Sequence, residues 1–418
     1  MKNKKLLFNL ALSVSMIAFF VSCEDYTGKY KITDGEPTIY YVRIPDASKA
    51  DSLLVGAYMG ETVCLVGDNL TSIKELYFND QKALLNINFI TKNTLIVTVP
   101  RNVPEERTDK IYMVLKDGTT KVDYDFLVRY PPAEVHSFLC EHVREGEKVV
   151  IYGDFFFNEP DVPVSVTVGD YVVPYSDVFI DELTKTELSF KAPPANVTGH
   201  VRVKTAYSVG RLSKVIFRDL RGMICNFDGG FVEGDWGRPN ASQIQNDPEL
   251  SLDGSKYMRW ECNIDMGVWN GMYDGGCCFN YWGQNRGIPT GNLFPSDPLT
   301  STLKFEANVL QAWSGAPLSI LFYAQGDNEN KIWDDGYPRG LWRPFYENGT
   351  ISPFTTDGWI TVSIPLKEFK LRSNGEDAAI DFPTAFGGLT IVGKVAGHPG
   401  EACSPVILID NIRVVPGD

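Results

Sequence analysis

The sequence predicts an all-β chain made of several β-sandwich domains. Gly (37) and Pro (25) are frequent and aromatic residues reach 12%. Long helical hydrophobic periods are absent, and short β-rich segments alternate with turn residues along the whole chain. At 418 residues the chain is too long for one compact core, so two to four domains are expected.

The formal net charge of −14 limits the classes of partner. A surface of this sign repels phosphate backbones and anionic lipid, so the sequence predicts no binding to nucleic acid. A neutral ligand is favoured. The alternative is that the charge serves solubility alone.

Residues 1–22 form an export signal that is not part of the fold. Lys2, Lys4 and Lys5 precede an apolar stretch, 6–21, which is too short to be a stable membrane span.

The end of this stretch, Phe20-Val21-Ser22-Cys23, resembles a bacterial lipobox, although Leu is usual where this chain has Phe20. The resemblance implies that Cys23 becomes the lipidated first residue and anchors the protein. The alternative is an ordinary signal peptide with an unrelated Cys. Residues 23–37 are expected to be a flexible tether, and its first acids resemble the surface-export signal of Bacteroidetes lipoproteins.

The first half of the chain contains an internal repeat. GETVCLVGD at 60–68 matches GEKVVIYGD at 146–154, and the Thr, Leu and Pro positions of 91–100 recur in 184–193. The paired Pro131-Pro132 stiffens the link between the copies. These motifs resemble IPT/TIG immunoglobulin-like (Ig-like) domains. The resemblance implies two Ig-like β-sandwich domains in tandem, 38–130 and 131–219, which act as a semi-rigid spacer.

The cysteines do not form a metal motif. Seven follow Cys23, an odd number, so at least one has no partner within the monomer. Cys64 alternates with apolar neighbours and is expected to be a small buried residue.

The third region, 220–418, contains all eight tryptophans of the chain, between Trp236 and Trp359. It also contains strand-like segments, which we place at 257–262, 302–309, 318–324, 359–365, 389–392 and 406–415. The NFDGG sequence at 226–230, the segment 358–366 and the last strand resemble carbohydrate-binding modules of the jelly-roll type. The resemblance implies a larger jelly-roll-type β-sandwich whose first and last strands are neighbours.

The order of these parts along the chain resembles Bacteroidetes surface glycan-binding proteins. This resemblance implies a lipid-anchored protein that faces the exterior from the cell outer membrane. It implies capture of a neutral polysaccharide or oligosaccharide, of the xyloglucan, β-glucan or mannan class, for a polysaccharide-utilisation system. The implied partners are surface glycoside hydrolases and a TonB-dependent importer.

Physical chemistry independently favours a sugar ligand for the Trp-rich region. A pyranose has apolar C–H faces and a hydroxyl rim, which match an indole face and planar polar side chains. Trp260 and Trp359 lie in alternating strands and are expected in the core, whereas the loops 263–291 and 331–343 combine rings with Gly, Asn, Asp and Arg. The predicted glycan-binding residues are Trp269, Tyr273, Trp282, Trp313, Trp333, Asp334, Asp335, Tyr337, Arg339, Trp342 and Arg343.

Two other functions stay open. A glycoside hydrolase needs a carboxylate pair, and acids are plentiful here, but no catalytic motif is recognisable, so we predict that the chain is not an enzyme. In a protein-binding adhesin, the Trp loops would form an interface. No cofactor is expected. Asp228, Asp327 and Asp410 are candidate ligands for a structural calcium, with a metal-free oxygen-rich loop as the alternative.

Overall fold

The structure is a computed structural model, and it describes most of the chain after residue 31. The described residues are 32–33, 35–102, 104–118, 121–159, 161–228, 241–266, 278–282, 298–324, 338–372, 374–382, 386–393 and 398–417, with the backbone alone for 278–282, 324 and 386–387. Every regular element in these ranges is a β-strand or a short 3-10 helix, which confirms the all-β prediction. No helix of the described part is long and apolar enough to cross a bilayer.

The chain divides into two compact units, Met1–Pro131 and Pro132–Asp418, and the boundary falls between the paired prolines. In the first unit one sheet has the order β1-β3-β6 and the other β5-β4-β7-β8, with a parallel pair β2-β9 beside them. The strands are β1 (Thr38–Arg43), β2 (Gly56–Tyr58), β3 (Thr62–Asp68), β4 (Ile73–Phe78), β5 (Gln81–Lys82), β6 (Thr94–Thr98), β7 (Lys110–Leu115), β8 (Lys121–Asp125) and β9 (Leu127–Arg129). The 3-10 helices are η2 (Ala47–Lys49), η3 (Leu70–Ser72) and η4 (Ile87–Phe89).

The second Ig-like domain has the same pair of sheets, β10-β11-β14 and β13-β12-β15-β16. Its strands are β10 (Glu134–Phe138), β11 (Lys148–Asp154), β12 (Ser165–Val168), β13 (Tyr171–Val172), β14 (Glu187–Lys191), β15 (Gly199–Lys204) and β16 (Leu212–Phe217), with η5 (Tyr175–Asp177) and η6 (Ile180–Glu182). The buried apolar residues of both sheets form one core.

The structure explains why the repeat contains two glycines. Gly60 and Gly146 have φ of 83° and 81°, a backbone conformation that favours glycine, at the turn before each long strand. At Gly67 a Cβ would lie 1.8 Å from the carbonyl oxygen of Thr38, and at Gly153 a Cβ would lie 2.0 Å from a carbonyl oxygen of the neighbouring strand. Each close approach lies beside a register shift in the strand pairing.

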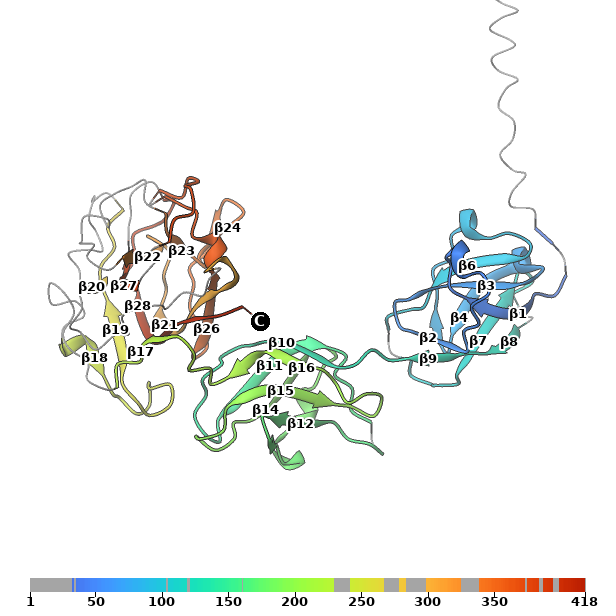
Figure 1. The fold of residues 1–418 in the computed structure, drawn as a ribbon, viewed down its shortest axis with the longest axis horizontal. Coiled ribbons are helices and arrows are strands. Elements are labelled where there is room, and N and C mark those ends of the chain that lie inside the picture. The colour runs from blue at the N-terminus through green and yellow to red at the C-terminus, as the bar shows by residue number, and fades with distance from the viewer. Residues whose placement is uncertain are drawn as a thin grey trace, which may run out of the picture. The chain divides into compact units, whose positions relative to one another are not determined.

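The C-terminal sandwich consists of a large sheet β18-β19-β28-β21-β26, with β17 also paired to β28, and a four-stranded sheet β20-β27-β22-β23 (Figure 1). Its strands are β17 (Met223–Cys225), β18 (Ile244–Gln245), β19 (Tyr257–Glu261), β20 (Cys278–Trp282), β21 (Thr302–Gln311), β22 (Leu318–Ala324), β23 (Gly340–Trp342), β24 (Tyr346–Glu347), β25 (Thr350–Ile351), β26 (Ile360–Pro365), β27 (Phe386–Gly393) and β28 (Val406–Val415). The 3-10 helices are η8 (Ala241–Gln243), η9 (Pro298–Thr300) and η10 (Leu366–Glu368). The pairing of β17 with β28 makes the first and last strands neighbours, as the jelly-roll resemblance implied.

A buried set of charges joins the second Ig-like domain to the C-terminal sandwich. Arg413 on β28 donates to Glu306 on β21 through Nη1 to Oε2 at 2.7 Å and through Nη2 to Oε1 at 2.9 Å. Its Nη2 also donates to Oε2 of Glu141, in the loop after β10, at 2.8 Å. Lys304 forms an ion pair with the same Glu141. These four residues, two anionic and two cationic, are at most 8% exposed.

Further hydrogen bonds complete this connection between the second Ig-like domain and the C-terminal sandwich, which we call the joint. The Thr361 N–H donates to the Leu139 carbonyl oxygen at 2.9 Å, and the Glu141 N–H donates to Thr361 Oγ1 at 2.7 Å. Thr361 Oγ1 in turn donates to Glu306 at 2.9 Å. Burial alone would raise the pKa of Glu306, but the Arg413 guanidinium outweighs it and keeps that pKa below its usual range. The carboxylate therefore stays charged, and the ion pairs persist at neutral pH.

Replacing Arg413 with Met is expected to destabilise the C-terminal sandwich by about 3–5 kcal/mol, because two buried carboxylates would lose their main cation. All tryptophans lie between Trp236 and Trp359, so urea unfolding of the full chain followed by Trp fluorescence reports this domain. The matched control is Lys370→Met, since the Lys370 side chain is 46% exposed. A loss below about 1 kcal/mol for Arg413→Met would contradict a stabilising role for the buried set.

Candidate glycan-binding site

The strand register shows where the two predicted aromatic loops join the four-stranded sheet. β20 ends with Trp282, which is paired with Gly388, and β22 ends with Ala324, which is paired with Phe386. Both strands therefore end at the same end of the sheet, and the segment that contains Trp333 follows Ala324 directly. Gly388 is also paired with Tyr323 of β22. The backbone thus aligns Trp282, Gly388 and Tyr323 in one row across three strands.

The central strands of this sheet, β22 and β27, are buried on both faces, and the two faces differ in chemistry. One row belongs to the hydrophobic core of the sandwich and contains Leu318, Ile320, Phe322, Leu389 and Ile391. The alternate row faces away from that core and contains Ser319, Leu321, Tyr323, Thr390 and Val392, all at most 4% exposed. The outward side of the sheet therefore carries buried polar groups.

Arg339 lies on this outward side. It forms a bridge with Leu371, its Nη1 donates to Ser319 Oγ at 3.2 Å, and its side chain is fully buried. This corrects the expectation that Arg339 lies on the surface, since a buried guanidinium is held by the protein itself. Arg343, by contrast, is half-buried, with its guanidinium 5.3 Å from the centre of the Tyr346 ring.

Trp313 and Trp342 are also core residues, which corrects the expectation that they present a face to a ligand. Their exposed fractions are 0% and 9%, and their ring centroids lie 5.1 Å apart in an edge-to-face contact. Trp313 Nε1 donates to the carbonyl oxygen of Gly315 at 2.6 Å. The short connection between β21 and β22 crosses from one sheet to the other, so the core covers its ring.

The two tryptophans that the sequence places in the core, Trp260 and Trp359, differ from each other in burial. Trp260 is fully buried in the core, as predicted. Trp359 is only half-buried and packs at the edge of a small cluster around Tyr257, with ring centroids 6.0 Å apart. The prediction of a core position is therefore wrong for Trp359.

Most of the other predicted binding residues lie outside the described part of the chain. These are Trp269, Tyr273, Trp333, Asp334, Asp335 and Tyr337, together with the lipidation residue Cys23, whereas Trp282 is described by its backbone alone. They stay predictions.

Several cysteines of the described part, and the histidine His142, are buried in the protein interior. Cys64, Cys140, Cys225 and Cys403 are free thiols, and Cys262 is in a disulfide. Cys64 is buried, as predicted, and burial raises the pKa of Cys225 to about 12. His142 is buried beside the Asp219 carbonyl oxygen, and burial lowers the pKa of its imidazole.

Asp410 is a buried acid whose carboxyl group is only partly hydrogen-bonded. It is 1% exposed, and its Oδ2 has no hydrogen-bond partner among the residues that the structure describes, while the Asn411 N–H donates to its Oδ1 at 2.7 Å. Burial, with added repulsion from Asp253, raises the pKa of Asp410 well above its usual range. Within the described ranges no three His, Cys, Asp or Glu side chains are grouped to hold a metal, and Asp327 lies outside these ranges. A calcium site therefore stays a prediction.

Comparison with known proteins assigns the family. Residues 217–416 match the family described as "Surface glycan-binding protein B xyloglucan binding domain". The crystal structure of a surface glycan-binding protein B from Prevotella bryantii is 32% identical to this chain with a TM-score of 0.72, and the match covers 92% of this chain and 99% of that one. The chain belongs to the surface glycan-binding protein B family. It is accordingly a cell-surface protein that binds glycans.

A curated relative is also named for IPT/TIG domains. An IPT/TIG domain-containing protein of Bacteroides ovatus is 33% identical over 200 residues, which are 46% of this chain and 39% of that protein. The chain thus spans less than half the length of this curated relative. The predicted family and the predicted fold class of tandem Ig-like domains and a larger sandwich are therefore confirmed.

Replacing Asp410 with Asn is expected to stabilise the surface glycan-binding protein at pH 7.5 by about 1.4 kcal/mol or more, because the buried carboxyl of the wild type must stay protonated at a pH where the unfolded carboxyl is ionised. The folded state of the wild type retains a proton that the unfolded chain loses above pH ~4. Wild-type stability therefore falls as pH rises toward the raised pKa of Asp410, and the advantage of the variant disappears near pH 4. Thermal unfolding in EDTA at both pH values measures the difference.

The exposed Asp381→Asn variant is the control and is expected to change stability by less than about 0.5 kcal/mol. If Asp410→Asn instead removes a stabilisation that only added calcium produces, Asp410 is a calcium ligand and the expectation of a neutral carboxyl is wrong.

Proposed function

We propose that this chain is a non-catalytic outer-membrane lipoprotein that captures a neutral β-linked polysaccharide, with xyloglucan as the first candidate. The match of residues 217–416 to a xyloglucan-binding family carries this proposal. That range contains all the tryptophans and both predicted aromatic loops. β-Glucans and mannans, which also present flat faces, are the next candidates.

Ring stacking is the interaction we propose for the predicted loops. Each sugar face covered by an indole contributes about 1–3 kcal/mol, by analogy with base stacking on aromatic side chains. Two or three such rings, after the entropic cost of association, give a dissociation constant in the micromolar range. The row Trp282–Gly388–Tyr323 supports a role for Trp282, because this row lies at the end of the sheet where the Trp333 segment begins.

The remaining parts are proposed to present this domain at the cell surface. Lipidation at Cys23 would anchor the chain in the outer membrane, and the two Ig-like domains would serve as the spacer. The proposed partners are surface glycoside hydrolases and a TonB-dependent importer. Capture of a polymer beside such partners raises its local concentration without any new contact.

Affinity electrophoresis through gels containing xyloglucan, mixed-linkage β-glucan or mannan tests the proposal. The wild-type chain is expected to be retarded by at least one of them. Trp333→Ala and Trp282→Ala are each expected to weaken binding by about 5- to 100-fold, the equivalent of one stacked ring. Tyr40→Ala on β1 is the control, because Tyr40 is 61% exposed but lies in the first Ig-like domain.

The same samples separate the competing functions. Release of reducing sugar from the retained polysaccharide would identify a glycoside hydrolase. Retardation by none of the three polymers would favour a protein-binding adhesin. Retardation that neither Trp substitution weakens would show that the assigned loops are not the binding site.

The lipid anchor has a separate test. Replacing Cys23 with Ser is expected to abolish incorporation of labelled palmitate and to shift the chain from the membrane fraction to the soluble fraction, because the acyl chains are the proposed anchor. Cys64→Ser, at a buried thiol, is the control and should retain the label. Unchanged membrane association of Cys23→Ser would contradict the anchor.

A further inference from the structure

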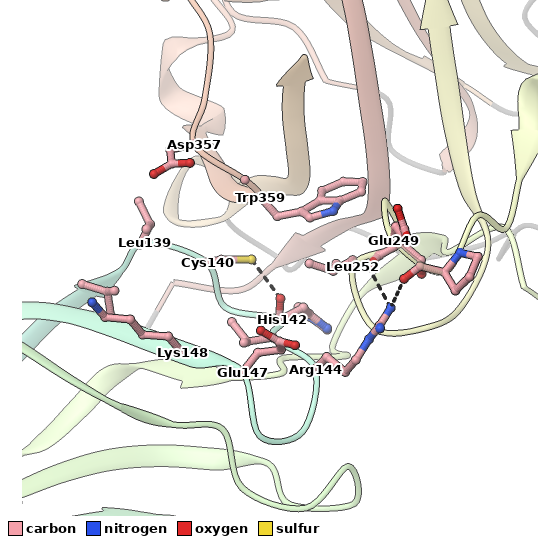
Figure 2. Close-up of a pocket in the computed structure, with 15 residues that line it drawn as sticks. Leu139, Cys140, His142, Arg144, Glu147, Lys148, Glu249, Leu252, Asp357 and Trp359 are labelled. Atoms are coloured by element: carbon pink, nitrogen blue, oxygen red, sulfur yellow. Dashed lines mark hydrogen bonds between the residues drawn. The ribbon is translucent and has the colours of Figure 1, made fainter. Parts of the chain in front are cut away.

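A cavity of about 350 Å³ lies between the second Ig-like domain and the C-terminal sandwich (Figure 2). We call it the joint cavity. Its walls come from residues 139–150 of the Ig-like domain and from 248–252 and 357–359 of the sandwich. Among the described residues, none that lines it belongs to either predicted aromatic loop.

Trp359 supplies the aromatic wall of the joint cavity. Its Nε1 donates to the Leu250 carbonyl oxygen at 2.8 Å, and Tyr257 meets it edge-to-face, so the indole is held in place. Figure 2 shows Trp359 on one side of the cavity and His142, Arg144 and Glu147 across from it. Gly358, with φ of 89°, forms the turn before it, and a Cβ there would meet no atom within 4 Å. The ring is therefore held in place where Trp359 lines the cavity.

Polar groups with unused hydrogen-bonding capacity surround this ring. Arg144 Nη2 donates to the carbonyl oxygens of Pro248 and Ser251 at 2.9 and 3.1 Å, which fixes the guanidinium. Among the residues that the structure describes, its remaining N–H groups have no acceptor. The carboxylates of Glu147, Glu249 and Asp357, all exposed residues, form no ion pair within the same ranges.

This chemistry selects the class of ligand. Three carboxylates repel an anion, while Arg144 disfavours a cation, and the nearby Lys148 is already paired with Glu182. A neutral molecule with one apolar face and a rim of hydroxyls would satisfy the ring, the carboxylate acceptors and the guanidinium donor together. A pyranose has these properties. The volume lies at the lower end of the range for ligand sites and suits about one or two sugar rings.

The cavity is held open by the joint itself. Leu139, in one wall, accepts a hydrogen bond from Thr361, two residues after Trp359. Glu141, next to Cys140 of the same wall, is bound by Arg413 and Lys304 of the sandwich. Because these contacts fix both walls, a ligand would enter a preformed site and would not have to order it.

We propose that the joint cavity is a second, weaker glycan-binding site that takes one or two neutral sugar rings of the captured polymer, stacked on Trp359. This inference rests on the proposed function for the choice of glycan. One stacked ring with a few solvent-exposed hydrogen bonds supports a dissociation constant of about 1–10 mM.

The test uses the full chain labelled with 5-fluorotryptophan, in which ¹⁹F NMR gives a separate signal for each tryptophan. The Trp359 signal is assigned as the one missing from Trp359→Phe. Cellobiose and a xyloglucan heptasaccharide are the probes, titrated to 50 mM. The Trp359 signal is expected to shift and saturate in the millimolar range. In a Glu249→Ala/Asp357→Ala variant the apparent dissociation constant is expected to rise about 5- to 10-fold, while exposed Glu347→Ala is the control.

The signals distinguish the two proposals. If other tryptophan signals shift and Trp359 does not, the second site is wrong and glycan capture stands. If no signal shifts with either probe, both proposals fail. If the Trp359 shift is the same in the Glu249→Ala/Asp357→Ala variant, the ring responds to binding elsewhere and the joint cavity is not a site.

Discussion

The buried ion pairs of Arg413 with Glu306 and Glu141 determine how the second half of this surface glycan-binding protein is organised. Removing four charged groups from water is costly, and the cost is offset because two anions and two cations meet with direct hydrogen bonds. The pairs cross from β28 and β21 to the loop after β10. An Ig-like domain and a glycan-binding sandwich therefore form a single compact unit, and the only boundary between units is at Pro131 and Pro132.

The fold could be predicted from the sequence because its signals are local. The paired glycines of the repeat, such as Gly60 and Gly67, mark turns and close backbone contacts. The alternating segments in the C-terminal region became β19, β21, β22, β26 and β28 to within two residues at either end, whereas the segment 389–392 covers only half of β27. The joint could not be predicted in this way. Glu141 and Arg413 are far apart in sequence, and no local pattern relates a loop acid to an arginine on the last strand.

The site was harder to predict because a tryptophan with polar sequence neighbours can lie either in a surface loop or in the core. Trp313 precedes Gly315 and Pro317, and Trp342 follows Pro338 and Gly340, as in a surface loop, yet both rings pack in the core. Their closeness to buried strands was the available signal: Trp342 ends β23, and Trp313 lies in the short connection between β21 and β22. Trp359 shows the opposite error, since an alternating strand pattern does not reveal that a second domain stops short of covering the ring.

The position of β28 affects how the protein must be made. β28 is paired with β19, β21 and β17, so a strand near the end of the described chain lies in the middle of the largest sheet. The sandwich cannot close until residue 415 has been synthesised, whereas the strands of the Ig-like domains are complete by residues 129 and 217. During synthesis β19 and β21 thus expose apolar surface without their central partner. The largest sheet is therefore the last part of the described chain that can become compact, and both Ig-like domains can fold before it.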